Sequence, residues 1–187
     1  HFKNDPRLAT ISLAPDARAN PVAIRAIEDA DIVVIAPGDL YTSLGSLLVI
    51  NGIGNALMKT NAIVVYVSNL VTKKGQTDGF TVSDHAAEIE RFAGGKILDF
   101  VLYNHQAPDE RLTAHYIESE GAVIVPVDKN VLENSSYHAI GGNFIGQIAT
   151  SQQNDTLPAT RSFIRHNSSA VASAIIELYD HARNKRS

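Results

Sequence analysis

The chain has 187 residues, of which 16 are Lys or Arg and 20 are Asp or Glu, so its net charge of -4 gives no general attraction to nucleic acid. It contains no cysteine, which excludes a disulfide framework, a thiolate zinc site and thiol catalysis. No apolar run approaches about 18 residues, and no signal peptide opens the chain, so no membrane span is expected. We therefore predict a soluble, cytoplasmic protein that folds as one domain over residues 1–187.

The first elements predict a strand, a helix and a second strand. Leu8–Leu13 is apolar enough for a strand that ends before Pro15. Asn20 and Pro21 suit the cap and the first position of a helix. The β-branched run Ile32–Ile35 follows, and such a run is typical of a strand that is buried on both faces of a parallel sheet.

The segment after this strand is the strongest candidate for a ligand site. Pro37 and Gly38 break the strand, Asp39–Ser43 is a turn rich in hydroxyl groups, and a mostly apolar helical segment starts at Leu44. Free backbone N–H groups and the positive end of a helix favour an anion at such a place. The segment predicts a phosphate site, with a nucleotide as the expected source of the phosphate.

Three glycines divide the helical segment Leu44–Lys59. Gly45, Gly52 and Gly54 each lower its helix propensity, so we expect two short helices that meet near residues 49–52. In a dinucleotide fingerprint the glycines lie between a strand and a helix. Because Gly52 and Gly54 lie within a helical stretch, close packing explains them better.

The remainder of the chain alternates predicted strands and helices, which indicates right-handed β-α-β units and a parallel sheet. A capping box opens one helix at Thr81, and Asn167 caps the last helix. Residues 131–162 show no clear period, so Gly141-Gly142 is expected in a loop, with at most a short strand at 143–149. The predicted strands are 63–68, 99–104 and 122–127, and the predicted helices are 81–93, 108–120 and 168–183.

Ligands of open α/β sheets bind beyond the carboxyl ends of the strands. In this chain those ends are rich in hydroxyl, amide, carboxylate and glycine groups. The loop 69–80 adds two glycines, two lysines and Asp78, which could bind phosphate or a metal. A solvated loop with ordinary turn residues is an equally good interpretation. The segments at the strand ends are 37–43, 68–78, 104–105 and 126–128.

The histidines do not form a metal motif. None of their pairs has the i, i+4 helical spacing of a zinc site, and no Gly-x-Ser-x-Gly nucleophile elbow is present. His85 and His105 could reach the strand ends, although packing or capping explains each of them better. No metal ligand is predicted from these residues.

Two long motifs stand out: Ala30–Ser43, ADIVVIAPGDLYTS, and Asn69–His85, NLVTKKGQTDGFTVSDH. Both resemble the gluconeogenesis-factor (YvcK) family, which shares a fold group with 2-phospho-L-lactate transferase (CofD). The similarity runs from about Ala14 to Asp128 and returns at Arg165–Asn167.

The resemblance implies a Rossmann-like, three-layer α/β fold with a mostly parallel sheet. It implies a regulator of carbon metabolism, cell-wall synthesis and cell shape that binds a UDP-sugar, typically UDP-N-acetylglucosamine. The transferase branch implies an alternative, an enzyme that transfers a phospholactyl group to a deazaflavin with a divalent metal. No other cofactor is expected, although Mg2+ could accompany a nucleotide ligand. The ligand-binding residues predicted from the turn, the loop and the resemblance are Gly38, Tyr41, Thr42, Ser43, Asn69, Thr72, Thr77, Asp78, Tyr116 and Arg165.

The chain departs from the family pattern in three ways. Family members begin with a strand and a Gly-Gly-Gly-x-Gly turn that this chain lacks, so we expect a C-terminal portion: a fragment, a proteolysed product or half of a split protein. A homo-oligomer or a separate N-terminal segment would then complete the site, or the chain could serve mainly as sheet core and oligomer interface.

The other two departures are single residues. Asp39 stands where the family usually has Ser and places a carboxylate beside the expected phosphate, which is repulsive unless Asp39 turns outward or shares a cation with the ligand. Asn167 replaces a more usual Asp and keeps the capping function.

Overall fold

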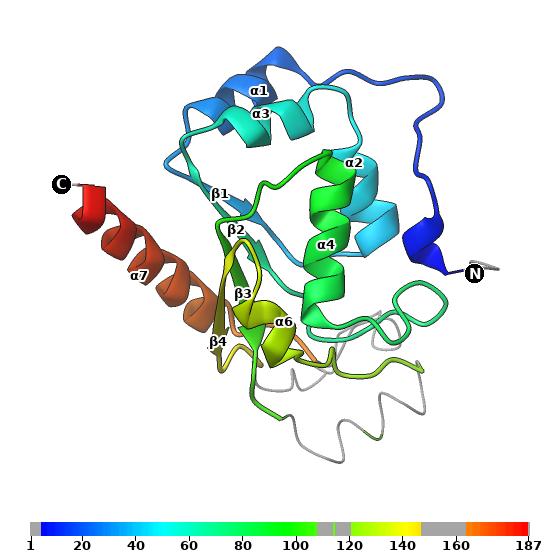
Figure 1. Cartoon of the computed structure of the whole chain (residues 1–187), viewed down its shortest axis with the longest axis vertical. Helices are drawn as coiled ribbons and strands as arrows, with labels where there is room; N and C mark the ends of the chain where they lie inside the picture. Colours follow the sequence, from blue (N-terminus) through cyan, green and yellow to red (C-terminus); the bar gives the residue numbers. More distant parts are fainter. Residues whose placement is uncertain (1–4, 108–113, 115–120, 147–163, 187) are drawn as a thin grey trace, which may run out of the picture.

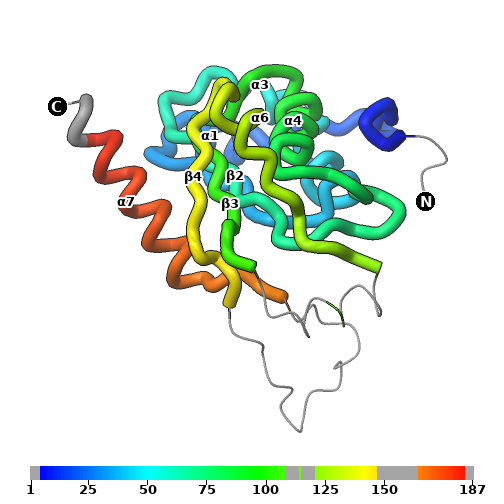
Figure 2. Tube along the Cα trace, turned by 60° about the horizontal axis from the view of Figure 1, so that its bottom comes forward, coloured from blue at the N-terminus to red at the C-terminus, as the bar shows by residue number. Residues whose placement is uncertain are grey.

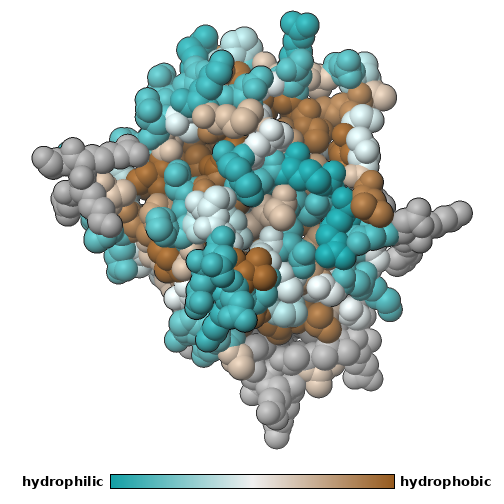
Figure 3. All heavy atoms as spheres, viewed as in Figure 1, coloured by the Kyte–Doolittle hydropathy of each residue, from teal (hydrophilic) through white to brown (hydrophobic). Residues whose placement is uncertain are grey.

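The computed structural model describes residues 5–107, 114, 121–146 and 164–186. It has three layers: a sheet lies between the long C-terminal helix α7 (Ser168–Arg186) on one face and a group of shorter helices on the other (Figure 1). Figure 2 shows the same arrangement from a second side, with α7 running along one face of the sheet. On the face seen in Figure 1, hydrophilic and hydrophobic residues are interspersed (Figure 3). The predicted three-layer α/β fold is confirmed.

The sheet has four described strands in the order β1-β2-β3-β4, and all of them are parallel. Each strand pairs with the next one along the chain, as in successive β-α-β units. Val33 lies opposite Val64, and Tyr66 lies opposite Val101. The strands are β1 Ile32–Ile35, β2 Ile63–Val67, β3 Phe100–Asn104 and β4 His138–Gly142.

β2 is an interior strand, and all five of its residues are buried. Its Tyr66 belongs to the core beneath the shorter helices, whereas its Val65 belongs to the core beneath α7. Among the described strands β1 lies at one edge of the sheet, and its Val34 is 43% exposed. The prediction that β1 is buried on both faces is therefore wrong, because the helix layers do not cover this edge of the sheet completely.

Three of the helices begin where the capping residues predict. The Asn20 side chain accepts a hydrogen bond from the first turn of its helix at 2.9 Å, and that of Asn167 does the same at 3.1 Å. Thr81 and Asp84 form a reciprocal capping box. Besides α7, the helical segments are η1 Pro6–Leu8 (a 3-10 helix), α1 Pro21–Glu28, η2 Leu40–Gly45 (a π-helical turn), α2 Ser46–Leu48, α3 Ile53–Lys59, α4 Val82–Ala93 and α6 Lys129–Glu133. Among the described helices, none combines the length and the apolar character needed to cross a membrane.

The predicted interruption of the helix after β1 is confirmed, since α2 ends at Leu48 and α3 begins at Ile53. Gly52 between them has a φ of 107°, a left-handed conformation that glycine adopts without strain. Gly54 packs against the end of α4, and a Cβ placed on it would lie 1.9 Å from the carbonyl oxygen of Ala93. Close packing and backbone conformation therefore explain these glycines.

The predicted strand at Leu8–Leu13 is wrong. Residues 9–13 form no strand and lie on the side of the shorter helices instead of joining the sheet (Figure 1). Arg91 on α4 donates to the carbonyl oxygen of Ala9 at 3.0 Å, and Ile11 packs against the core beneath the shorter helices. The apolar pattern of such a short segment predicts that it packs against the core, but it does not predict whether the segment joins the sheet or lies against a helix.

The last described strand of the sheet is formed by residues 138–142 and not by the predicted strand 122–127. Residues 122–127 do not join it, and Ile124 instead forms an isolated antiparallel bridge with Val71. The strand beside β3 is β4, although its Gly141-Gly142 pair is typical of a loop. A Cβ on Gly141 would lie 2.8 Å from His105 Nδ1, so the missing side chain permits close packing inside the strand.

Two further predictions fall partly outside the described residues. Of the predicted helix 108–120, the structure describes residue 114, which is helical. Of the predicted short strand 143–149, the described residues 143–146 form no strand, and Ile145 makes an isolated bridge with His166.

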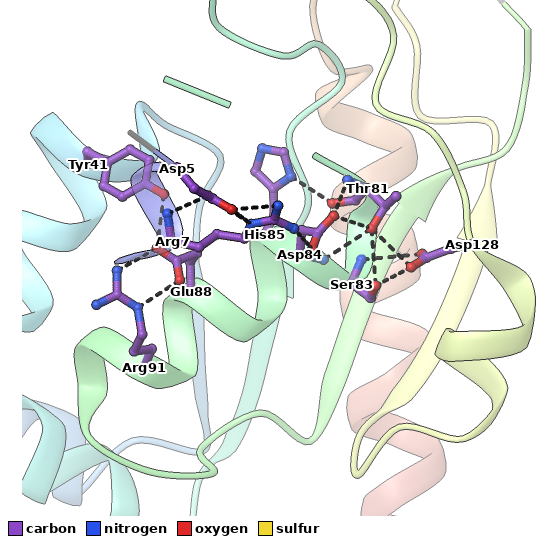
Figure 4. Close-up of polar contacts among 10 residues, drawn as sticks. All are labelled: Asp5, Arg7, Tyr41, Thr81, Ser83, Asp84, His85, Glu88, Arg91 and Asp128. Carbon is purple, nitrogen blue, oxygen red and sulfur yellow. Dashed lines mark hydrogen bonds and ion pairs between the residues drawn. The ribbon is translucent and has the colours of Figure 1, made fainter. Parts of the chain in front are cut away.

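His85 lies on α4, and its imidazole is fully buried. Figure 4 shows the ring beside Thr81. His85 Nδ1 lies 2.8 Å from the carbonyl oxygen of Thr81, and the ring meets Phe80 edge to face. A carbonyl only accepts, so Nδ1 carries the proton, and Nε2 has no hydrogen-bond partner among the described residues. Burial holds the pKa of His85 below its ordinary value of 6.5, against the opposing effects of the Thr81 carbonyl and of the charges on Asp84 and Glu88.

We expect the protein to lose stability as the pH falls below about 6.5, because the unfolded chain then takes up a proton that folded His85 resists. The folded-state pKa is the lower one, so this contribution is fully present above the unfolded pKa and is lost as the pH falls through the folded pKa. The pKa of His166 is lowered in the same direction, also by burial. His85→Gln should therefore remove part of the slope of unfolding free energy between about pH 5 and pH 7 in urea titrations. The exposed residue His138 offers the control His138→Gln, and an unchanged slope in the His85 variant would contradict this account.

Candidate functional site

A cavity of about 600 Å³ opens at the carboxyl ends of β1 and β2. Open parallel sheets bind ligands at this edge, and the volume is typical of small-molecule pockets. The segments that follow the two strands meet in its walls. The cavity is lined by Pro37, Gly38, Asp39, Asn69, Leu70, Val71, Thr72, Lys73, Lys74, Ala122, Ile164, Arg165 and His166.

Asn69 joins the two strand ends. Its Nδ2 donates to the carbonyl oxygen of Gly38 at 2.9 Å, and its Oδ1 accepts a hydrogen bond from the Tyr66 hydroxyl at 3.3 Å. Tyr66 is fully buried, and burial raises the pKa of its hydroxyl, which remains a protonated donor. The Asn69 amide is thus held from both sides and keeps the end of β1 against the end of β2.

Two of the predicted site residues shape the loop after β2. Thr77 is buried, and its hydroxyl accepts a hydrogen bond from the backbone N–H of Lys73 at 2.7 Å. The carboxylate of Asp78 accepts one from the backbone N–H of Gly75 at 2.5 Å. Neither Thr77 nor Asp78 lines the cavity, but together they fold the loop that presents Lys73 and Lys74 to it.

Thr72 belongs to a second wall, formed where residues 122–125 lie along the loop. Its hydroxyl accepts a hydrogen bond from the backbone N–H of Val123 at 3.1 Å, and its own backbone N–H donates to the Val123 carbonyl at 2.8 Å. Val125 extends the same pairing by donating to the Leu70 carbonyl at 3.0 Å. The segment that sequence predicts as a sheet strand is therefore extended, and it supports one side of the cavity.

The turn after β1 differs from the predicted phosphate cradle. Asp39 lines the cavity and forms an ion pair with Lys73, while its carboxylate also accepts a hydrogen bond from the Thr42 hydroxyl at 3.1 Å. Thr42 does not line the cavity, and Ser43 lines a separate apolar groove beside β1. The start of the turn, including Gly38, is the part that borders the cavity.

Tyr41 lies in a polar network with α4 and not in the cavity wall (Figure 4). Its hydroxyl donates to Glu88 at 3.0 Å, and the Arg91 guanidinium donates twice to the same carboxylate, at 2.6 and 2.7 Å. Burial, followed by the charge of Glu88, raises the pKa of Tyr41, so its hydroxyl stays a donor. Tyr41 therefore attaches the turn to α4.

The segment before α7 supplies the last part of the wall. The backbone carbonyl of Arg165 accepts a hydrogen bond from Gly146 at 2.7 Å, which places this segment beside the end of the sheet. His166 Nε2 lies 3.1 Å from the carbonyl oxygen of Ser68, directly after β2. Burial lowers the pKa of His166, which favours a neutral imidazole that donates from Nε2.

The predicted site residues thus divide into three groups. Four line the cavity: Gly38, Asn69, Thr72 and Arg165. Five are described but lie outside its lining: Tyr41, Thr42, Ser43, Thr77 and Asp78. Tyr116 lies outside the described residues.

The cavity also contains charged and polar residues that the predicted set omits, namely Asp39, Lys73, Lys74 and His166. The two lysines have a signal in the sequence, because they lie in a polar loop directly after a strand. His166 is far from the strand ends in sequence, and its one signal is that it lies within the Arg165–Asn167 stretch that resembles the family. Within the part of the chain that the structure describes, no group of three or more His, Asp or Glu residues is placed to hold a metal ion.

The fold and the cavity define an α/β protein with a ligand pocket at the carboxyl ends of a parallel sheet. The family described as 2-phospho-L-lactate transferase CofD matches residues 3–145, which is more than half of the chain. The chain belongs to the CofD family.

The similar proteins bear out the resemblance to gluconeogenesis factors. A gluconeogenesis factor of Halalkalibacterium halodurans is 33% identical over 172 residues, which cover 91% of this chain and 49% of the relative. A protein of Clostridium acetobutylicum, provisionally named a gluconeogenesis factor, is 38% identical over 162 residues, which cover 87% of this chain and 33% of the relative. The crystal structure of a UPF0052 family member from Bacillus halodurans matches with a TM-score of 0.75 and 32% identity, covering 86% of this chain and 48% of that one. The chain therefore spans about a third to a half of the length of these relatives.

Proposed function

We propose that the cavity binds a nucleotide-linked ligand, a UDP-sugar such as UDP-N-acetylglucosamine. In this proposal the protein regulates carbon metabolism and cell-wall synthesis, including cell shape, and is not a catalyst. The observation that carries the proposal is the convergence of Lys73, Lys74 and Arg165 on one cavity at the carboxyl ends of β1 and β2. The names of the similar gluconeogenesis factors support the regulatory part.

The chemistry of the lining suits a diphosphate that is linked to a sugar. Lys73 and Arg165 come from separate segments, so a phosphate between them would meet positive charge from two sides, and a guanidinium matches two phosphate oxygens at once. Asn69 and a neutral His166 offer hydrogen bonds that suit ribose or sugar hydroxyls. The volume of about 600 Å³ lies within the usual range for ligands larger than a single phosphate.

The family match favours a second candidate function, that of a phospholactyl transferase acting on a deazaflavin with a divalent metal. The described residues do not fit a metal held by the protein, because Asp39 is the one carboxylate of the described cavity lining and is paired with Lys73. Mg2+ carried by a nucleotide ligand would need fewer protein ligands. Metal-dependent turnover of a nucleotide-activated phospholactate would favour this candidate over the regulatory one.

UDP-N-acetylglucosamine is expected to raise the melting temperature of the intact protein. At a ligand concentration of about 100 times Kd the folded state gains about 2.7 kcal/mol. For a protein of this size that gain corresponds to a rise of about 5–10 °C in a scanning fluorimetry experiment. Free N-acetylglucosamine, which lacks phosphate, should produce no comparable rise. The absence of a shift at millimolar UDP-N-acetylglucosamine would contradict the proposal.

Arg165→Ala should reduce this shift, whereas Arg25→Ala, which removes an exposed arginine from α1, should retain it. Thr42→Ala should also retain it, because Thr42 lies outside the cavity lining. If Arg165→Ala also leaves ligand binding unchanged, the chain serves mainly as sheet core and oligomer interface.

A further inference from the structure

The cavity combines one acidic residue with several basic ones. Asp39 follows β1 and Lys73 follows β2, and their ion pair spans the two strand ends. The other charged residues of the described lining are Lys74 and Arg165, both basic. The Asp39 carboxylate therefore lies beside the ammonium group of Lys73, and an anionic ligand would bind the same ammonium group.

Lys73 is held at its backbone independently of this ion pair. Its N–H donates to the Thr77 hydroxyl at 2.7 Å, and its carbonyl accepts hydrogen bonds from the N–H groups of Gln76 and Thr77, both at 2.9 Å. The root of the side chain thus stays beside the cavity whether or not Asp39 is its partner. The Nζ group itself is on a flexible, partly exposed stem that can change partners.

Asp39 is also held by its own turn. Its carbonyl accepts hydrogen bonds from the N–H groups of Ser43 and Leu44, both at 3.0 Å, and its carboxylate accepts one from the Thr42 hydroxyl. The strand ends have a separate link, since Asn69 donates to the Gly38 carbonyl. Loss of the ion pair would leave both walls of the cavity in place.

We propose that the Asp39 carboxylate is an internal competitor for the phosphate of the ligand. It neutralises Lys73 in the unliganded protein, and a nucleoside diphosphate-linked ligand must displace it to reach the same ammonium group. Asp39 therefore lowers the affinity of the site for its ligand and disfavours weak anions, which cannot replace the carboxylate. This inference rests on the proposed function and specifies how the same site is regulated.

Asp39→Asn removes the charge while keeping the shape and an oxygen that can accept from Thr42. Binding of UDP-N-acetylglucosamine and of inorganic pyrophosphate to the intact protein is measured by calorimetry, in EDTA and again with Mg2+. Because partly exposed ion pairs are weak, the variant should bind both ligands roughly two- to fivefold more tightly. The gain should shrink as salt screens the charges. In the background of Lys73→Met the gain should disappear, since the competitor then has no cation to occupy.

Asp29→Asn is the matched control, because it makes the same change of net charge at an exposed residue after α1. Equal gains in the two variants would overturn the inference in favour of a net-charge effect. Equal or weaker binding by Asp39→Asn, while the wild type binds UDP-N-acetylglucosamine, would overturn the inference and leave the proposed function intact. Weaker binding by the variant that is seen with Mg2+ but not in EDTA would also overturn the inference, because Asp39 would then share a cation with the ligand.

The two ligands separate this inference from the proposed function. If pyrophosphate shows the gain but UDP-N-acetylglucosamine binds to no variant, the competition stands and the proposed function fails. If neither ligand binds at all, both fail.

Discussion

Gly54→Ala is expected to lower the free energy of unfolding by about 3 kcal/mol or more. Alanine has a higher helix propensity than glycine, and this preference alone would stabilise α3 by about 1 kcal/mol. The steric effect is larger, because the added Cβ would lie 1.9 Å from the carbonyl oxygen of Ala93 and 2.8 Å from its carbon. Both are backbone atoms, so relief requires α3 and α4 to move apart, with loss of the contacts between them.

Gly95→Ala is the matched control, because its added Cβ would meet the sulfur of Met58. Met58 is 45% exposed and flexible, so its side chain can move aside at little cost. Urea titrations of the two variants should therefore give a large loss for position 54 and a change within about 1 kcal/mol for position 95. A Gly54→Ala protein as stable as the wild type would show that the helices are not packed this closely.

Glu88→Ala should have the second largest effect, a loss of about 2 kcal/mol. Glu88 is 4% exposed, and its carboxylate accepts two hydrogen bonds from Arg91 and one from Tyr41. Removal of one partner of a fully buried ion pair costs about 3–5 kcal/mol, and the smaller value here reflects the 37% exposure of the Arg91 side chain to water. The variant also leaves the buried hydroxyl of Tyr41 without this acceptor.

Glu177→Ala on the exposed surface of α7 is the control, and it should change stability by less than about 0.5 kcal/mol. Tyr41→Phe should cost about 1 kcal/mol, because it removes one hydrogen bond of the network. Combined with Glu88→Ala it should add little, since both changes remove the same interaction. Fully additive losses, read from the same urea titrations, would contradict the network.

The sequence is informative where the physical cause is local. Asn20, the pair Thr81 and Asp84, and Asn167 satisfy backbone groups within their own first turn, so each predicts a helix start that the structure contains. The strand at 63–67 is similarly predictable, because its continuous apolar run Ile-Val-Val-Tyr-Val has the length and composition of a strand. The sequence alone also identifies the family through two motifs in the correct order, and the family match confirms that assignment.

The tertiary structure decides matters that depend on distant parts of the chain. Gly141 lies in a strand because β4 pairs with β3, where it lies opposite Tyr103, a distant pairing that no local pattern reveals. Distant contacts also decide the places of Tyr41 and His166. Tyr41, a predicted ligand-binding residue, is bonded to Glu88 on α4 and lies outside the cavity lining. His166, which is not among the predicted residues, is bonded to the Ser68 carbonyl and lines the cavity. Local patterns in the sequence specify the parallel α/β class, the three capped helix starts and the family. Only the three-dimensional packing decided which polar residues share a cavity and that Asp39 pairs with Lys73, because both depend on contacts between strand ends that lie more than 30 residues apart.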